Sequence, residues 1–156
     1  MAIFQDLVAA ALVVLPVVHG MVSVFSWSGG GFTSFCAYPG ANLTDHWLGV
    51  FCQNDNSATF GYNYSWINLD LCVGNNAGQL VNYEYGNYSE SCRNCSIFSS
   101  HSLHLVCSCA DVQGQLQNST LDLNTTLFDS DGAASCFNYF GNKSWTGPDP
   151  KGPSPW

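Results

Sequence analysis

The sequence contains few charged residues, and among these the basic ones are far fewer than the acidic ones. Only 9% of its 156 residues are charged, against about a quarter in ordinary globular proteins. The basic side chains are Arg93, Lys143 and Lys151, and the formal net charge is −8. So acidic a chain repels phosphate groups, which argues against nucleic acids and anionic membrane surfaces as partners.

Long apolar runs and catalytic signatures are also missing. The apolar run of residues 7–18 is too short to span a bilayer, so we predict no membrane span. The sequence has no G-x-S-x-G elbow, no phosphate-binding loop with lysine and no H-E-x-x-H spacing. We therefore predict no enzyme activity, no cofactor and no metal site, with one alternative left open. Two glycosidase carboxylates that only folding brings together would escape this search.

The N-terminal residues 1–20 are typical of a secretory signal peptide. Val18 and Gly20 suit a cleavage site after Gly20, although cleavage as late as Ser23 fits too. The alternative is a buried apolar N-terminal element. Eight cysteines and seven glycosylation sequons support export, so we expect a secreted, extracellular glycoprotein. The sequons begin at Asn42, Asn63, Asn87, Asn94, Asn118, Asn124 and Asn142.

The C-terminal residues 141–156 have a different composition from the rest of the chain. They contain four prolines and show no apolar periodicity. This pattern predicts a disordered, Pro/Gly-rich tail.

An internal repeat organises the sequence between these ends. Cys36 and Cys92 are followed 16 and 15 residues later by Cys52 and Cys107. Further matching segments lie 54 residues apart: SWINLD (65–70) with STLDLN (119–124), and NNAG (75–78) with DSDG (129–132). The chain therefore contains two copies of one unit, at residues 32–83 and 88–137.

Each copy predicts β-structure, because short runs of Val, Leu, Phe, Tyr and Thr alternate with clusters of Gly, Asn, Asp and Ser. We expect three short strands, a tight turn and a hairpin per copy, with NNAG and DSDG as hairpin turns. Two such units can bury their apolar faces only against each other. The sequence thus predicts one all-β, pseudo-symmetric domain over residues 30–137.

Eight cysteines allow 105 disulfide pairings. If the two copies are equivalent, Cys36–Cys52 and Cys92–Cys107 are corresponding bridges. Cys95 then pairs with Cys109, and elimination leaves Cys72–Cys136. The alternative is a zinc site with four thiolates at Cys92, Cys95, Cys107 and Cys109.

The repeat also resembles a known family. The run ESCRN (90–94), the LDLN segment (121–124) and the D-G turn resemble the second repeat of cyanovirin-N-like lectins, the CVNH family. The first half, with INLD (67–70) and GNNAGQL (74–80), is similar to the form in filamentous fungi. The resemblance implies two pseudo-symmetric β-lobes that exchange hairpins. It also implies one shallow site per lobe for mannose-type oligosaccharides, without metal.

The resemblance places the main binding site in three segments. They precede the first cysteine, follow its partner and form the final turn. The residues are Gly31, Ser34 and Phe35, then Gln53, Asn54 and Asp55, then Asp129, Ser130 and Asp131. A second, weaker site would use Asn87, Tyr88, Glu90 and Ser91 with the residues after Cys107. That site departs from the family pattern at Gly74, Cys109 and Ala110, and a glycan on Asn87 would crowd it.

These observations predict a secreted lectin whose partners are oligosaccharides or glycoproteins. A secreted structural or host-interaction protein that has kept the fold and lost sugar binding is the alternative. Exchange of hairpins between repeats is compatible with a monomer or a domain-swapped dimer.

Overall fold

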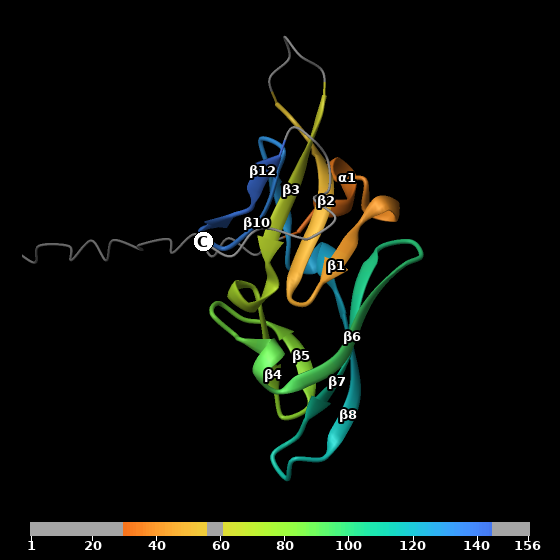
Figure 1. Ribbon diagram of the computed structural model, residues 1–156, viewed down its shortest axis with the longest axis vertical. Coiled ribbons are helices and arrows are strands. Elements are labelled where there is room, and N and C mark those ends of the chain that lie inside the picture. The colour runs from red at the N-terminus through yellow and green to blue at the C-terminus, as the bar shows by residue number, and fades with distance from the viewer. Residues whose placement is uncertain (1–29, 56–60, 145–156) are drawn as a thin grey trace, which may run out of the picture.

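Alternating apolar residues build short antiparallel strands throughout the residues that this computed structural model describes, 30–55 and 61–144. Strand β7 (Leu103–Ala110) shows the pattern plainly, because Leu103, Leu105, Cys107 and Cys109 are buried and the residues between them are half-buried. Such a strand covers the core with one face and meets water with the other. The strands form two lobes along the long axis of the molecule (Figure 1).

Lobe A, at the top of Figure 1, contains a four-stranded sheet and a three-stranded sheet. The first has the order β1-β2-β3-β12 and the second the order β11-β10-β9. A short helix, α1 (Phe32–Phe35), and a 3₁₀ turn, η1 (Tyr38–Gly40), belong to this lobe. Its strands are β1 (Asn42–Thr44), β2 (Trp47–Gln53), β3 (Tyr62–Asn68), β9 (Phe128–Ser130), β10 (Ala133–Cys136), β11 (Tyr139–Phe140) and β12 (Asn142–Ser144).

Lobe B contains a three-stranded sheet, in the order β6-β7-β8, and the hairpin β4-β5. The 3₁₀ turns η2 (Leu69–Leu71) and η4 (Leu123–Thr125) follow β3 and β8, and η3 (Tyr88–Glu90) leads into β6. The remaining strands are β4 (Val73–Asn76), β5 (Gln79–Asn82), β6 (Cys92–Ser99) and β8 (Leu116–Asp122).

The two sequence repeats exchange their hairpins. The β4-β5 hairpin of the first repeat packs against β8, and β10 of the second repeat packs against β3. In lobe A the Ala134 N–H donates to Ser65 Oγ at 3.0 Å, and in lobe B the Leu80 N–H donates to Ser119 Oγ at 2.8 Å. Ala134 lies 54 residues after Leu80, and Ser119 lies 54 residues after Ser65, so the two hydrogen bonds correspond. The predicted pseudo-symmetric, two-lobed fold is confirmed.

One apolar core runs through both lobes. Buried side chains from the lobe A sheet and from the lobe B sheet join in a single cluster. The Cys72–Cys136 disulfide lies in this cluster and joins the start of the first hairpin to the end of the second. The largest fully buried aliphatic members are Leu48, Ile67, Leu69, Leu103, Leu105, Leu123 and Leu127.

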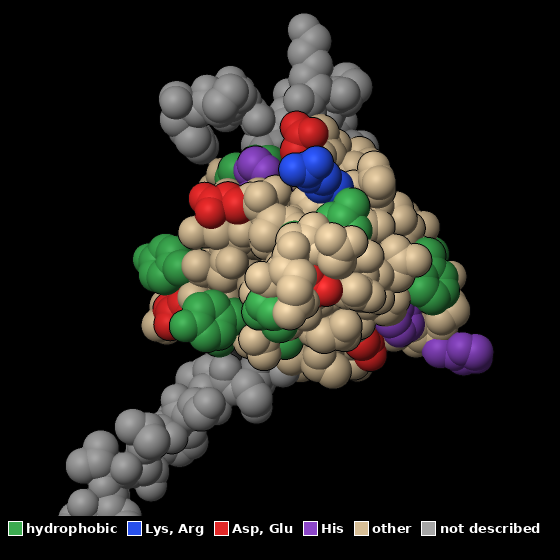
Figure 2. All heavy atoms as spheres, turned by 90° about the horizontal axis from the view of Figure 1, so that it is seen from below, with side chains coloured by type: hydrophobic (Ala, Val, Ile, Leu, Met, Phe, Trp, Pro, Cys, Tyr) green, Lys and Arg blue, Asp and Glu red, His purple; other side chains and the backbone are tan. Residues whose placement is uncertain are grey.

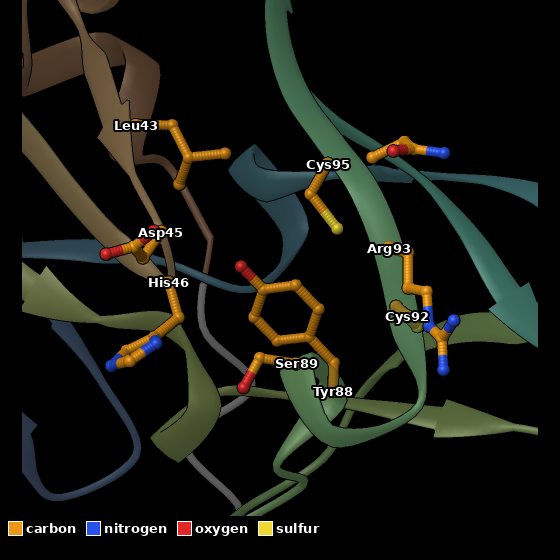
Figure 3. A pocket seen from close by; sticks show the side chains of 9 residues that line it. Leu43, Asp45, His46, Tyr88, Ser89, Cys92, Arg93 and Cys95 are labelled. Atoms are coloured by element: carbon orange, nitrogen blue, oxygen red, sulfur yellow. The ribbon is translucent and has the colours of Figure 1, made fainter.

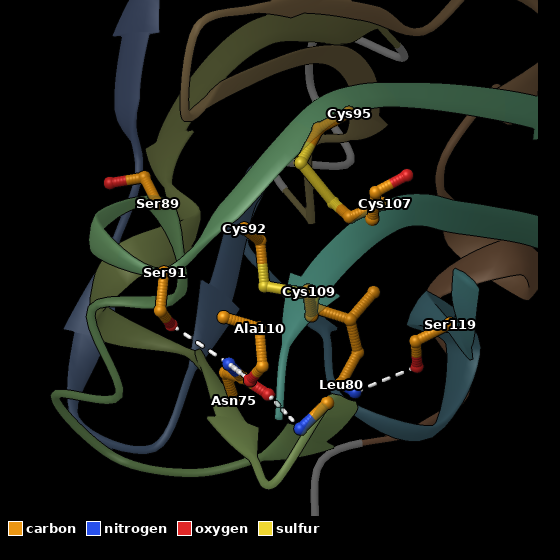
Figure 4. Close-up of a disulfide and its surroundings, with 12 residues drawn as sticks. Asn75, Leu80, Ser89, Ser91, Cys92, Cys95, Cys107, Cys109, Ala110 and Ser119 are labelled. Atoms are coloured by element: carbon orange, nitrogen blue, oxygen red, sulfur yellow. Dashed lines mark hydrogen bonds between the residues drawn. A yellow bond between two sulfur atoms is a disulfide. The ribbon is translucent and has the colours of Figure 1, made fainter. Parts of the chain in front are cut away.

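All eight cysteines form disulfides, which leaves no thiolate for zinc. The predicted bridges Cys36–Cys52 and Cys72–Cys136 are confirmed. The predicted bridges Cys92–Cys107 and Cys95–Cys109 are wrong, because the structure has Cys92–Cys109 and Cys95–Cys107 instead (Figure 4).

The register of the β6-β7 hairpin explains this correction. Cys92 lies directly opposite Cys109, and a bulge between Arg93 and Ser96 brings Cys95 opposite Cys107. A forward step on one antiparallel strand is a backward step on its partner, so bridges across a hairpin must nest rather than cross. The true counterpart of Cys52 is accordingly Cys109.

The C-terminal end of the described residues also differs from the prediction. Residues 142–144, which were predicted to be part of a disordered tail, form β12 and pair with Tyr64, Ser65 and Trp66 of β3. Residues 145–156 and the predicted signal peptide, 1–20, lie outside the described residues. Within the described residues, no helix is long and apolar enough to cross a bilayer.

Candidate functional site

Lobe A brings the three predicted segments together. The Cys36–Cys52 disulfide joins the segment after Gly31 to the end of β2. A carboxylate oxygen of Asp129, in the β9-β10 hairpin, lies within 4.8 Å of both sulfur atoms of this bridge. The Asp55 N–H donates to Asp131 Oδ1 at 3.0 Å and thereby fixes the hairpin turn against the chain beyond β2. We call these three segments the lobe A site.

The β9-β10 turn has the conformation that its D-S-D-G sequence predicts. Asp129 Oδ1 accepts the Gly132 N–H at 3.1 Å and closes the turn. Asp131 and Gly132 both have positive φ, 50° and 80°. A Cβ at position 132 would lie 2.8 Å from Asn63 Nδ2, so the turn needs glycine for space as well as for conformation. This geometry leaves Asp129 Oδ2 without a hydrogen bond among the described residues.

The two carboxylates of the β9-β10 hairpin, Asp129 and Asp131, have pKa values shifted in opposite directions. Lys143 Nζ lies 3.0 Å from Asp131 Oδ2, and this hydrogen bond holds the pKa of Asp131 below its ordinary value. Burial raises the pKa of Asp129 to about 6, against the opposing Gly132 N–H, and the Asp55 and Asp131 carboxylates add to the rise. Asp129 therefore changes charge near neutral pH, whereas Asp131 is ionised and paired.

The other predicted residues of the site are distributed unevenly around it. Ser34, Phe35 and Asp55 are exposed, while Gln53 and Asn54 are half-buried. Gly31 caps the short helix α1 with φ 81°. The Ser130 side chain lies on the opposite face of β9 from Asp129, because consecutive side chains of a strand point to opposite faces. It instead lines a separate hollow of about 350 Å³ with Phe128, Phe137, Asn138 and Phe140.

Lys143 is the functional residue that the sequence did not reveal. It lies on β12, opposite Ser65 of β3, and this pairing carries its ammonium group to the hairpin turn. A lysine among glycine, asparagine and proline gave no periodic signal for a strand. Lys143 reaches Asp131 only because β12 pairs with β3 as the fourth strand of the sheet.

In lobe B, Asn75 occupies the place that Asp129 has in lobe A. Its Oδ1 accepts the Gly78 N–H at 2.8 Å, as Asp129 Oδ1 accepts the Gly132 N–H. Its Nδ2 donates to Ser91 Oγ at 2.9 Å and to the Ala110 carbonyl at 2.8 Å (Figure 4). Both amide hydrogens are thus used within the protein.

The predicted residues of the second site are only partly brought together. Ser91 meets the Asn75 turn and Glu90 is exposed beside it. Asn87 is exposed with φ 45° and pairs with Gly74. Tyr88, the fourth residue predicted for the second site, is 1% exposed and belongs to the core.

The surface at the lobe B end carries few charges. Seen from below, most of the face consists of backbone and uncharged polar side chains, with scattered acidic groups and separate apolar patches (Figure 2). Exposed Tyr83, Tyr85, Phe98 and Leu116 are among the large apolar side chains of this lobe. Nothing in this distribution resembles a basic surface for nucleic acid.

Comparison with known proteins agrees with this architecture. The CVNH domain family matches residues 32–133 and, in a second overlapping match, residues 88–147. The chain belongs to the CVNH domain family. A search of curated proteins found no match.

Solved structures with the CVNH fold resemble this protein in shape more than in sequence. The NMR structure of the Gibberella zeae CVNH protein is 18% identical, with a TM-score of 0.58 over 67% of this chain and 95% of that one. A MoCVNH3 variant in complex with (N-GlcNAc)4 is 14% identical, with a TM-score of 0.59 over 69% and 97%. Microvirin in complex with mannobiose is 20% identical, with a TM-score of 0.56 over 69% and 99%.

Within this CVNH fold the two lobes present different surfaces. In lobe A, the half-buried Asp129 has one carboxylate oxygen without a hydrogen bond among the described residues, near exposed Asp55 and the Asp131–Lys143 pair. Lobe B closes the corresponding turn with internal hydrogen bonds from Asn75. Polar groups available to a ligand are therefore concentrated in lobe A.

Proposed function

We propose that this protein is a carbohydrate-binding lectin that binds mannose-type oligosaccharides at the lobe A site and catalyses no reaction. The observation that carries the proposal is the Oδ2 of Asp129, which has no hydrogen bond among the described residues and lies near Asp55 and the Asp131–Lys143 pair. A carboxylate can accept hydrogen bonds from two neighbouring sugar hydroxyls, and such charge-assisted bonds are about twice as strong as neutral ones.

Two related structures support sugar as the ligand class. The MoCVNH3 variant is bound to (N-GlcNAc)4 and microvirin is bound to mannobiose. Each of these two ligands is a chain of sugar rings. Mannose is our choice because the sequence resembles the mannose-binding lectins of this family.

A glycan array on the purified protein tests the proposal. Discrete signals for oligomannosides are the expected result, and the Asp129→Ala variant should lose most of each signal. Signals confined to N-acetylglucosamine chains would overturn the mannose assignment. A blank array for a folded protein would favour the alternative, a scaffold without sugar binding.

The alternative has one structural observation in its favour. Asn75 uses both amide hydrogens and one oxygen lone pair on Ser91, Ala110 and Gly78, as a turn retained for stability would. This observation concerns lobe B alone. The scaffold hypothesis therefore requires that lobe A too is inactive, which the same array decides.

Secretion is the second part of the proposal. Four disulfides in one small domain need an oxidising compartment to form and persist. Expression of the full chain in a secreting eukaryotic cell should release a protein whose N-terminus is Met21 or close to it. Retention of the protein in the cytosol with residues 1–20 intact would contradict the proposal.

A further inference from the structure

The fold exposes the asparagines of the glycosylation sequons to very different degrees. Most of them are exposed, one is half-buried and one is buried. The exposed ones are Asn42, Asn87, Asn94, Asn118 and Asn142, the half-buried one is Asn124 and the buried one is Asn63. An N-linked glycan is bulky and needs a surface position, so the structure separates sequons that can carry one from sequons that cannot.

Asn63 shows why a buried sequon cannot carry a glycan in the folded protein. The residue is 3% exposed, and its Nδ2, the atom to which a glycan is attached, is buried without a hydrogen bond among the described residues. A Cβ added at Gly132 would lie only 2.8 Å from this nitrogen. The β9-β10 turn of the lobe A site therefore leaves no space for a sugar on Asn63.

The strand that carries this sequon is central in lobe A, whereas its counterpart in lobe B lies at an edge. β3, which contains Asn63, has β2 on one side and β12 on the other. β8, which contains Asn118, is the last strand of the β6-β7-β8 sheet. Five consecutive residues of β3 are buried, but in β8 only Ser119 is. Pairing with β12 thus helps to bury the lobe A sequon, and the lobe B sequon stays exposed.

Asn124 is the second sequon that the fold keeps from the surface. Its Oδ1 accepts the Thr33 N–H at 2.9 Å and the Thr33 hydroxyl at 2.8 Å. These bonds hold the half-buried amide between η4 and α1, next to the segment that begins at Gly31. A bulky group on the same amide would press on α1, so we expect Asn124 to stay unmodified.

In lobe B, by contrast, the exposed sequons have room for a sugar. Asn94 lies in the β6 bulge with φ 53° and lines an open pocket of about 360 Å³ between the lobes. Figure 3 shows this pocket, with Asp45 and His46 of lobe A opposite Cys95 of β6. The open space can take the first sugar ring of a glycan on Asn94.

We propose that lobe B carries N-linked glycans at Asn87, Asn94 and Asn118, while Asn63 and Asn124 stay unmodified and keep attached sugar away from the lobe A site. The proposal rests on the secretion proposed above. The donor is an oligosaccharide on a lipid diphosphate. A bond forms between Nδ2 and the first sugar carbon, the bond from that carbon to the diphosphate oxygen breaks, and Nδ2 loses one proton as the lipid diphosphate leaves.

The remaining exposed sequons lie on the edge strands of the lobe A sheet. Asn42 is on β1 and Asn142 is on β12, at opposite ends of the order β1-β2-β3-β12. The Asn142 side chain points to the opposite face of β12 from Lys143, which reaches Asp131. Glycans at both positions leave the Asp131–Lys143 pair accessible, and we expect both to be present.

Glycans in these positions give the two lobes different surfaces. Asn87 directly precedes η3, which ends at Glu90. A glycan on Asn87 therefore lies beside the predicted second site and covers it. The lobe A site remains the surface at which the modified protein can bind an external sugar.

Peptide mapping of the secreted protein tests the proposal. The full chain, preceded by an established export signal, enters the secretory pathway of a eukaryotic cell whatever residues 1–20 do. An amidase that removes the glycans in heavy-oxygen water converts each modified asparagine to a labelled aspartate, which mass spectrometry locates. The label is expected at every exposed sequon and at neither Asn63 nor Asn124. Label at either of these two, or no label at an exposed sequon, would overturn the proposal.

Two variants that keep every asparagine provide matched controls. Thr120→Ala removes the hydroxyl of the Asn118 sequon and should lower the mass of the secreted protein by one glycan. Thr126→Ala removes the Asn124 sequon in the same way and should leave the glycan mass unchanged. The Thr126 hydroxyl is buried without a hydrogen bond among the described residues, so alanine there should not unfold the protein. The opposite result for either variant would contradict the proposal.

The label does not depend on sugar binding, so its outcome is separate from that of the lobe A proposal. A blank glycan array would overturn the lobe A proposal and leave the glycan positions standing.

Discussion

At the turn of the exchanged hairpin, lobe A has Asp129 where lobe B has Asn75. Each Oδ1 accepts the N–H three residues later, so each side chain closes its turn identically. The second polar atom differs in its use. The Asn75 Nδ2 binds two groups of the protein, whereas the Asp129 Oδ2 has no hydrogen bond among the described residues.

One fold thus uses the same turn for stability in lobe B and leaves it available for a ligand in lobe A. The exchange of one amide for one carboxylate is sufficient to separate the two uses. An amide can donate to Ser91 Oγ and to a backbone carbonyl, while a carboxylate can only accept. The variants below disturb the comparison between the lobes, in order of decreasing effect.

The largest effect should come from removing the bridge that joins the two hairpins. Cys72 and Cys136 are 64 residues apart, so the bridge restricts the unfolded chain strongly. The double variant Cys72→Ala, Cys136→Ala should lower the free energy of unfolding by about 4 kcal/mol in the loop-entropy account. Urea denaturation followed by circular dichroism measures this change.

The bridge unique to lobe B provides the matched control. Cys95 and Cys107 are 12 residues apart and lie beside a second bridge in the same hairpin. Their double alanine variant should lose at most about 3 kcal/mol. A greater loss than for the Cys72–Cys136 variant would show that the β6-β7 hairpin, and not the link between the hairpins, determines stability.

The two buried serines should make equal contributions if the lobes are equivalent. Ser65 Oγ accepts the Ala134 N–H in lobe A, and Ser119 Oγ accepts the Leu80 N–H in lobe B. Replacing either serine by alanine leaves a buried N–H without a partner, at a cost of about 1–3 kcal/mol. Thermal unfolding of both variants compares them, and costs that differ several-fold would disprove the equivalence of these contacts.

Sugar binding should depend on lobe A rather than lobe B. Asp129→Ala removes a charge-assisted acceptor and should weaken oligomannoside binding about tenfold or more. Glu90→Ala, in lobe B, should have a much smaller effect. Titration calorimetry of both variants measures the difference. Equal losses, or a larger loss for Glu90→Ala, would show that the lobe A assignment is wrong.

The sequence predicted the fold well because the repeat is a pattern that spacing reveals. The turns NNAG and DSDG and the serines of SWINLD and STLDLN lie at one offset, and the structure keeps that offset in their hydrogen bonds. The disulfides were predicted less well. Between Cys92 and Cys109 the offset shifts, because the second repeat has a bulge and a shorter loop before β8.

The candidate site was predicted in outline, and its details were not. Segment order identified Asp55, Asp129 and Asp131, which the structure brings together. Lys143 was missed because a strand of three residues leaves no periodic signal. The resemblance assigned Tyr88 to the second site without showing that it is buried, because resemblance gives positions along the chain, whereas burial depends on how the chain packs.

The pKa of Asp129 makes the comparison between the lobes sensitive to pH. Burial raises the pKa to about 6, so the folded protein holds this proton more tightly than the unfolded chain does. The resulting contribution to stability is present below the ordinary value of 3.8 and is lost as the pH rises through about 6. Ligand binding should change in the opposite sense, because the ionised carboxylate accepts hydrogen bonds better than the acid.

Oligomannoside affinity should therefore rise between pH 5 and pH 7, by up to about tenfold if only the ionised form binds. Titration calorimetry at a series of pH values measures this rise. The Asp129→Asn variant keeps the oxygen that closes the turn and cannot ionise, so its affinity should be low and flat over the same range. The ionised Asp131 is held by Lys143 with a lowered pKa and contributes no change there. A wild-type affinity that is constant from pH 5 to pH 7 would show that the Asp129 carboxylate does not accept from the sugar.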